Sequence, residues 1–337
     1  MSQNGIVGGS NATATNKFCQ VDNFLTNCND QDDFLIKSGT KRQREIMEEK
    51  TIINNSVLED LVGYISKNGV QQSIKPIFKT EDFALYNDDS LEVMSRFPDN
   101  YLDMIFADPP YMLSNDGFTC QNGRMVSVNK GKWDKSNGFE DDLNFHETWI
   151  RECKRVLKPE GTIWISGTYH SIYQCGFLLQ KLGFHLLNDI TWFKPNASPN
   201  LSCRFFTASH ETILWARKDK KAKHYFNYEA MKNGRFPEDN IKKPNLQMRS
   251  VWSIPTPAPS EKEFGKHPTQ KPLALLKRIV LASTKQGDII FDPFNGGGTT
   301  GIATTIIGER KYFGCNSSKE DYLGVTLPLP CSKLTHR

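Results

Sequence analysis

The chain lacks the long apolar runs and clustered cysteines that several classes of protein require. No uninterrupted apolar stretch is long enough to span a bilayer, and residues 1–18 lack the basic-then-apolar pattern of a signal peptide. The eight cysteines are scattered, with no C-x-x-C pair and no histidine spacing suited to zinc. We therefore expect a cytoplasmic protein with reduced, mostly buried thiols and no bound metal.

Strong charge and internal repetition are absent as well. A net charge of +4 in 337 residues indicates a nucleic-acid partner only weakly, so the placement of the charges matters more than their sum. No internal repeat and no heptad pattern is present. A chain of this length fits one large α/β domain with an insert, or two smaller domains.

Composition divides the chain into regions. Residues 1–50 are rich in polar residues and poor in aliphatic ones, which predicts a disordered polar leader because too little surface can be buried to offset chain entropy. Apolar residues at helical spacing between Val57 and Ile65 predict a short helical lead-in within 51–75. A compact domain is expected over 76–325, followed by an irregular tail over 326–337.

Within this domain, strand-like apolar runs alternate with amphipathic helices, which predicts a Rossmann-like, doubly wound and mostly parallel sheet of the α/β class. One helix is expected to begin with Asp142 as its cap and to stop at Pro159-Glu160-Gly161. Residues 114–138 show no regular period and are expected to form a mobile loop. The expected strands are 101–107, 162–166, 186–193, 211–216, 288–291 and 311–315, and further helices are expected over 170–182, from Pro272 onward and over 299–307.

Asp108-Pro109-Pro110-Tyr111 places a carboxylate, a proline-locked turn and an aromatic ring at the tip of a predicted strand. The exocyclic amine of adenine or cytosine is a poor nucleophile because its lone pair is delocalised into the ring. Hydrogen-bond acceptors that grip its hydrogens favour a tetrahedral nitrogen able to attack a methyl sulfonium. Asp108 and the Pro109 carbonyl can supply these acceptors, and Tyr111 can stack on an extruded base. A plain proline turn capped by Asp is the alternative interpretation.

A second motif, residues 292–300, contains a G-x-G-x-x-G match that begins at Gly296. A dehydrogenase would carry this turn early in its cofactor domain with an acidic residue about twenty positions later, and a phosphate-binding loop would place a lysine after the glycines. Neither condition holds. An adenosyl cofactor without phosphates fits better, because Phe294 can pack on it and Asp292 can face an ammonium group. A tight strand-to-helix turn without a ligand is the alternative.

From Phe83 to Gly314 the chain resembles the β-class DNA amino-methyltransferases, in which the catalytic motif precedes the cofactor motif. Segments 89–91, 131–134 and 267–272 share this resemblance. It implies S-adenosyl-L-methionine as cofactor and a target-recognition segment at about 195–265. By this resemblance the catalytic residues are Asp108, Pro109, Pro110 and Tyr111, and the cofactor-binding residues are Thr269, Gln270, Lys271, Asp292, Phe294, Gly296, Gly298, Thr299 and Asn316.

Segments 196–206 and 210–218 look most like the second methyltransferases of DpnII-type restriction systems, which modify adenine in GATC, and less closely like HinfI-type methyltransferases, which read GANTC. Asp at the head of the catalytic motif leans toward adenine over cytosine in this family. The implied substrate is double-stranded DNA, with single-stranded DNA kept open. The resemblance further implies a cognate restriction endonuclease that is genetically linked but need not be bound, and it leaves a homodimer open.

A basic stretch begins at Arg217, with a local excess of six positive charges interleaved with Tyr225, Phe226 and Tyr228. Phosphate contact plus aromatic insertion is the functional interpretation, and a solvated basic loop is the alternative. The candidate DNA-binding residues are Asn200, Arg204, Arg217, Lys218, Lys220, Lys221 and Lys223.

Two departures from the family pattern bear on activity. Family members usually end the strand after the glycine turn with an acidic residue that binds the ribose, and here Asn316 stands at that position. The prolines at 328 and 330 also prevent a closing helix. A DNA-binding homologue with impaired catalysis therefore remains an alternative function. A cytosine-N4 methyltransferase is a further alternative, since the leading Asp only leans toward adenine. Methylation of RNA or of a protein glutamine is disfavoured, because such enzymes commonly carry Asn-Pro-Pro-Tyr with the cofactor motif first.

Overall fold

The structure is a computed structural model, and it describes residues 74–317 apart from 114–117, 122–123, 128–133, 263–266 and 268. The polar leader, the helix expected within 51–75 and the irregular tail lie outside the described residues. Within the described part of the chain, no helix is long and apolar enough to cross a membrane.

A nine-stranded sheet in the order β1-β2-β11-β10-β3-β6-β8-β7-β9 forms the centre of the described domain. Neighbouring strands are parallel except that β1 runs against β2, and β8 runs against β6 and β7. The predicted mostly parallel sheet is therefore confirmed. The strands are β1 (Phe78–Lys79), β2 (Phe83–Asn87), β3 (Leu102–Ala107), β6 (Leu157–Gly167), β7 (His185–Phe193), β8 (His210–Arg217), β9 (Val251–Ser253), β10 (Ile289–Asp292) and β11 (Lys311–Asn316).

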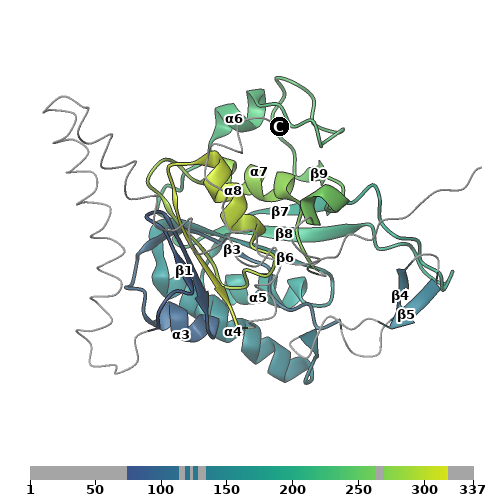
Figure 1. Ribbon diagram of the computed structural model, residues 1–337, viewed down its shortest axis with the longest axis horizontal. Coiled ribbons are helices and arrows are strands. Elements are labelled where there is room, and N and C mark those ends of the chain that lie inside the picture. The colour runs from purple at the N-terminus through teal and green to yellow at the C-terminus, as the bar shows by residue number, and fades with distance from the viewer. Residues whose placement is uncertain are drawn as a thin grey trace, which may run out of the picture. The chain divides into compact units, whose positions relative to one another are not determined.

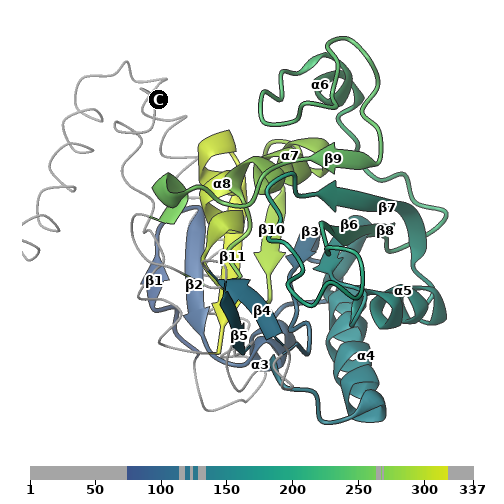
Figure 2. The same cartoon turned by 90° about the vertical axis from the view of Figure 1, so that its right-hand side faces the viewer.

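Helices cover both faces of this sheet (Figures 1 and 2). On one face lie α3 (Ser90–Ser95), α4 (Phe139–Val156) and α5 (Ile172–Lys181), and on the other lie α7 (Leu273–Ser283) and α8 (Thr299–Ile307). In α4, the apolar residues Trp149, Ile150 and Cys153 are buried, as expected of an amphipathic helix. The connections hold α6 (Tyr228–Asn233) and the short 3-10 helix η2 (Pro259–Lys262).

The boundaries of α4 differ from the prediction. The expected cap at Asp142 is wrong, because the helix already begins at Phe139 and Asp142 lies inside its first turn. The Asp142 carboxylate instead accepts hydrogen bonds from the Ser136 hydroxyl at 2.6 Å and the Asn137 N–H at 3.2 Å. The predicted stop at residues 159–161 is also wrong: α4 ends at Val156 and these residues belong to β6, whose first residue pairs with β3.

The segment 114–138, expected to be irregular, contains a two-stranded hairpin of β4 (Phe118–Gln121) and β5 (Arg124–Ser127). The two strands pair antiparallel from 118 with 127 to 121 with 124. Of the rest of the segment, the structure describes residues 134–138, which directly precede α4. The prediction of a loop without regular structure is therefore wrong for this part.

Strands β3 and β10 lie side by side, with Ile105 opposite Phe291. From β3 the sheet continues through β6 on one side, and from β10 it continues through β11 on the other. In open α/β sheets, ligands bind beyond the carboxyl ends of the strands where the connections diverge in this way. Asp108 and Asp292, far apart in sequence, end these two strands and so reach the same edge of the sheet.

A buried ion pair fixes the long connection between β8 and β9 to α7. The Arg278 guanidinium lies 2.7 Å from Asp239 Oδ2, and both side chains are at most 1% exposed. The same guanidinium lies over the rings of Phe236 and Trp252, at 4.7 and 4.9 Å from their centroids. Because a buried charge must be paired and hydrogen-bonded, this contact holds the connection in one place.

Candidate active site at the carboxyl edge of the sheet

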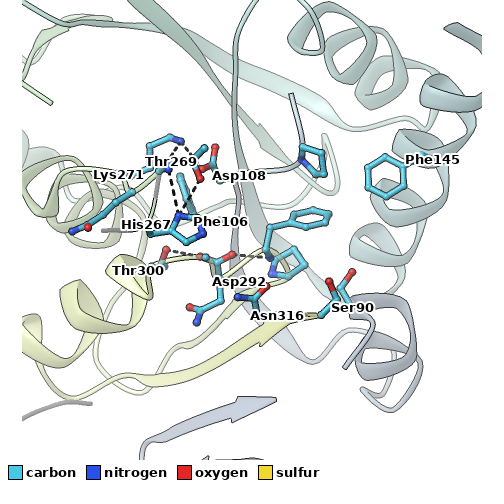
Figure 3. Close-up of a pocket in the computed structure, with 18 of the residues that line it drawn as sticks. Ser90, Phe106, Asp108, Phe145, His267, Thr269, Lys271, Asp292, Thr300 and Asn316 are labelled. Carbon is cyan, nitrogen blue, oxygen red and sulfur yellow. Dashed lines mark hydrogen bonds and ion pairs between the residues drawn. The ribbon is translucent and has the colours of Figure 1, made fainter. Parts of the chain in front are cut away.

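A cavity of about 400 Å³ opens at the carboxyl edge of the sheet, between the ends of β3 and β10 (Figure 3). This volume lies in the usual range for a small-molecule site. Of the residues assigned from the sequence, those that line it are Asp108, Pro110, Thr269, Gln270, Lys271, Asp292, Phe294, Gly296, Thr299 and Asn316. Pro109, Tyr111 and Gly298 are not among the lining residues.

The glycine turn between β10 and α8 requires glycine at two positions. Gly296 has φ 47° and Gly298 has φ 71°, a left-handed conformation that residues with a Cβ rarely adopt. A Cβ on Gly296 would also lie 3.3 Å from the His267 ring. Gly301, the last glycine of the motif, serves packing: a Cβ there would lie 2.7 Å from Phe83 and Tyr312.

Asp292 is a buried carboxylate at the floor of the cavity. Its Oδ2 accepts the Thr300 hydroxyl at 2.6 Å, and its Oδ1 accepts the Phe294 N–H at 3.0 Å. Burial raises the pKa of Asp292 to about 7, against the opposing effect of these hydrogen bonds. A cationic ligand group would favour the ionised form of this carboxylate.

The wall beside Asp292 combines an aromatic surface with amide groups. The Phe294 ring packs edge-on against Trp149, with centroids 5.4 Å apart. Asn316 pairs with Asn87 on the adjoining strand, and its side-chain nitrogen is buried without a hydrogen-bond partner among the described residues. A flat apolar group, a hydroxyl acceptor for this nitrogen and an ammonium for Asp292 are all parts of an adenosylmethionine, so the residues present fit that cofactor.

Asp108 stands at the other side of the cavity, and both of its oxygens are engaged. Oδ1 accepts the Tyr111 hydroxyl at 2.6 Å and the Ser166 hydroxyl at 2.5 Å, while Oδ2 forms an ion pair with Lys271. The Tyr111 hydroxyl also lies 3.0 Å from Glu211 Oε2. Burial, together with the charges of Asp108 and Glu211, raises the pKa of Tyr111 well above its usual value.

A second buried carboxylate, Glu211, lies behind Asp108. Lys194 forms an ion pair with its Oε1, and Lys271 Nζ lies 3.8 Å from its Oε2. Burial alone would raise the pKa of Glu211, but the charges of Lys271 and Lys194 lower it. Burial alone would lower the pKa of Lys271, but Asp108 and Glu211 raise it. Two lysines and two carboxylates thus form a charge-balanced cluster.

Sequence reasoning missed Ser166, Lys194 and Glu211. Ser166 lies near the carboxyl end of β6, and Glu211 lies near the amino end of β8, which runs antiparallel to β6. The available signal was the presence of polar residues at the ends of strands that reach the same sheet edge as Asp108. To use this signal, one must know the position of β8 in the sheet, which the sequence pattern does not supply.

The residues that follow Asp108-Pro109-Pro110 are held by Asp134. This carboxylate is 1% exposed, and it accepts the backbone N–H groups of Tyr111 and Met112 at 2.9 Å and of Leu113 at 3.2 Å. Met112 has φ 58°, which is uncommon for a residue with a side chain. Asp134 is the last residue of the family-like segment 131–134, of which residues 131–133 lie outside the described part.

Two of the candidate DNA-binding residues lie in the loop between β7 and β8, at the same sheet edge as Asp108. Arg204 is exposed there, and beside it Phe206 is 97% exposed. The Asn200 side chain is used within the loop, since its Nδ2 donates to the Phe205 carbonyl at 2.7 Å and its Oδ1 accepts the Ser202 N–H at 3.0 Å. Asn200 therefore shapes the loop that presents Arg204.

The structure does not bring the basic stretch together with Asp108. Arg217 pairs with Thr162 at the amino end of the parallel strands, the opposite edge from the cavity. Lys218 Nζ donates to Asn100 Oδ1 at 2.7 Å and to the Leu157 carbonyl at 2.6 Å. Lys220, Lys221 and Lys223 follow on this side and are exposed. A role in DNA binding for these residues stays a prediction.

Comparison with known proteins gives one family. Residues 102–324 match the family model for N6/N4 DNA methylases, described as DNA methylase. The chain is 49% identical to the Type II methyltransferase M2.MboI of Moraxella bovis over 251 residues, which cover 73% of this chain and 88% of that protein. It is 51% identical to the Type II methyltransferase M2.DpnII of Streptococcus pneumoniae over 247 residues, which cover 73% of this chain and 89% of that protein.

Solved structures agree with this result. The M1.HpyAVI complex with SAM is similar with a TM-score of 0.50 and 25% identity, covering 72% of this chain and 95% of that one. The cytosine-N4-specific PvuII DNA methyltransferase is similar with a TM-score of 0.55 and 18% identity, covering 77% of this chain and 93% of that one. The second likeness concerns the fold alone.

Proposed function

Because this chain belongs to the N6/N4 DNA methylase family and is an S-adenosylmethionine-dependent DNA methyltransferase, we propose that its target is the N6 amine of adenine in a short duplex site. The observation that supports this most is that the Asp108 carboxylate lines the same cavity as Asp292 and Phe294. One cavity can therefore hold the methyl donor and the acceptor amine together.

In this proposal Asp108 and the Pro109 carbonyl accept the two amine hydrogens, which favours a tetrahedral nitrogen with its lone pair free to attack. Pro109 does not line the cavity, so its carbonyl would have to become accessible when the base binds. S-adenosylmethionine supplies the methyl group as part of a sulfonium, so transfer neutralises the donor, and the methylated nitrogen then gives up one proton to solvent. The chain contributes orientation and hydrogen bonds to the nitrogen where charge develops. The target base must leave the duplex to reach Asp108. Stacking of Tyr111 on that base would require its buried ring to become accessible first.

The cofactor would bind with its ammonium near Asp292, its flat base near Phe294 and its ribose near Asn316. Gly296, Gly298 and Thr299 would form the turn beneath it, and segment 269–271 would close the methionine side. The buried Asp292 carboxylate and the buried amide nitrogen of Asn316 support this orientation. Lys271 is engaged with Asp108, so a direct contact with the methionine part would require that ion pair to open.

We expect the recognition site to be GATC because of the similarity to M2.DpnII and M2.MboI, with GANTC next because of the weaker resemblance to HinfI-type methyltransferases. A methyltransferase domain over 76–325 and a target-recognition segment at about 195–265 belong to the same proposal. So do a cytoplasmic location, a genetically linked restriction endonuclease, action on single-stranded DNA and a homodimer. Arg204 in the β7–β8 loop would contact DNA near the target base.

The proposal is tested by methyl transfer from labelled S-adenosylmethionine to synthetic duplexes that differ only in the recognition site. We expect incorporation into GATC duplexes and none when the site adenine of each strand is replaced by purine, which lacks the N6 amine. Incorporation that follows cytosine rather than adenine would support the cytosine-N4 alternative. Binding of the cofactor without incorporation into any duplex would support a homologue with impaired catalysis.

A further inference from the structure

The carboxylate assigned to the target amine is already paired with a cation. Lys271 forms an ion pair with Asp108 Oδ2, and both residues line the cavity, whereas Tyr111 and Ser166 reach Oδ1 from the protein interior. An amine that enters from the cavity therefore meets the Lys271 side of the carboxylate.

The ion pair opposes the reaction in two ways. A carboxylate whose charge is neutralised by an ammonium is a weaker acceptor for the amine hydrogens. Methyl transfer also places positive charge on the target nitrogen, and a second positive charge beside the same carboxylate raises the energy of that state. The Lys271 ammonium must therefore move away from Asp108, or be neutralised, when the base binds.

A buried ammonium cannot be left without a partner, because the loss of its hydration costs several kcal/mol. Glu211 Oε2 lies 3.8 Å from Lys271 Nζ, so a displacement of about 1 Å brings the two within hydrogen-bond distance. Glu211 is 8% exposed, and Lys194 holds its other oxygen. The flexible four-carbon stem of a lysine allows such a shift without movement of the backbone.

We propose that Glu211 is a positioning residue that receives the Lys271 ammonium when the target amine takes its place at Asp108. The inference rests on the role proposed for Asp108. The groups that contact Lys271 Nζ are the carboxylates of Asp108 and Glu211, the Tyr111 ring and the Thr269 carbonyl at 3.4 Å, and Asp292 also acts on it electrostatically. Glu211 is the carboxylate of this set that contacts Lys271 and does not line the cavity.

The test is single-turnover methylation at saturating S-adenosylmethionine and DNA. Glu211→Gln keeps the shape of the side chain and its contact with Tyr111 but removes the negative charge, so it cannot form an ion pair with an ammonium. We expect the rate to fall by about tenfold or more, while the Kd of the cofactor stays within a few-fold. Glu211→Asp should recover part of the rate. Glu160→Gln, an exposed change at the opposite sheet edge, is the matched control and should leave the rate unchanged.

A double-mutant cycle separates this role from a purely structural one. In a Lys271→Met background there is no ammonium to receive, so Glu211→Gln should reduce the rate far less than in the parent. If Glu211→Gln does not fold, it is combined with Lys194→Met. The double variant removes both charges of the buried Lys194–Glu211 ion pair, so no unpaired charge is left there, and it should show the same rate loss. A rate within twofold of the parent, or equal losses in both backgrounds, would overturn the proposal.

The test distinguishes failure of the proposed adenine methylation from failure of the positioning role. If the proposed adenine methylation is wrong, the parent protein methylates no adenine in any duplex. A parent that methylates adenine, together with a Glu211→Gln variant of normal rate, would contradict only the positioning role.

Discussion

The Asp134 carboxylate accepts the backbone N–H of Tyr111 at 2.9 Å, although the two residues are 23 positions apart in the chain. The same carboxylate accepts the next two backbone N–H groups, so it fixes the conformation of the chain that leaves the catalytic motif. Hydrogen bonds to an ionised group are stronger than those between neutral groups. Asp134 therefore determines where Tyr111 stands relative to Asp108.

Asp134→Ala should lower the methylation rate by at least about tenfold, because three backbone N–H groups, one buried and two part-buried, lose a charged acceptor. The thermal midpoint should fall as well. Asp189→Ala, a change at an exposed position of β7, is the control and should alter neither quantity. A normal rate in the Asp134 variant would show that the loop keeps its conformation without this carboxylate.

Cofactor binding should depend on pH through Asp292. Its pKa is raised to about 7 by burial, whereas an ammonium ligand requires the ionised carboxylate. We therefore expect cofactor affinity to rise from pH 6 to pH 8 in calorimetric titrations and to level off above that. Asp292→Asn should bind more weakly at pH 8 and show a smaller dependence.

The Asp292 carboxyl should also make the stability of the ligand-free protein depend on pH, but stability should fall where cofactor affinity rises. Because the folded-state pKa lies above the ordinary value near 4, the protonated carboxyl stabilises the ligand-free fold fully below about pH 4. This contribution is lost as the pH rises through about 7. The thermal midpoint of the parent should therefore decline relative to that of Asp292→Asn across this range. Parallel midpoints would show that Asp292 is not the titrating group.

Asn316→Asp should tighten cofactor binding, since a carboxylate bonds a ribose hydroxyl more strongly than an amide does. Asn316→Ala should weaken cofactor binding, because the variant lacks the buried side-chain nitrogen that would bind the ligand. Equilibrium titration at pH 8 measures both. Unchanged or weaker affinity in the Asp variant would mean that Asn316 does not face the ribose.

The two basic regions should contribute unequally to DNA binding. Arg204→Ala, at the cavity edge, should weaken binding of a GATC duplex and reduce the slope of log affinity against log salt by about one. The pair Lys220→Ala and Lys221→Ala, at the opposite edge, should change both quantities less. The reverse order in a salt series would assign the phosphate contacts to the basic stretch.

Much of the fold could be predicted because strands and helices of this domain differ in period. The boundaries of α8 agree with the prediction, and β3, β7, β8 and β11 agree within one or two residues. The beginning of α4 could not be predicted, because Asp142 is a good capping residue by type but bonds backward to Ser136 and Asn137. The hydrogen bonds of Asp142 with the preceding loop therefore override its local preference for the capping position.

The candidate site divides in the same way. Asp108 and Asp292 could be assigned because each stands in a contiguous motif. Glu211 and Lys194 could not, because their role depends on β8 lying beside β6 and on the side chain of Lys271 reaching from the segment before α7. The placement of Arg217 at the far edge likewise follows from the antiparallel direction of β8, which charge composition does not encode.

The central claim is methylation of adenine at Asp108. It is tested most directly in a host that has no adenine methylation of its own: plasmid DNA from the expressing host is digested to nucleosides and analysed. The parent should yield N6-methyladenine, detected by mass, and no N4-methylcytosine. Asp108→Ala, which removes the acceptor for the amine, should yield neither, while it binds S-adenosylmethionine within a few-fold of the parent. N4-methylcytosine or no methylated base from the parent, or N6-methyladenine from the Asp108 variant, would contradict the account.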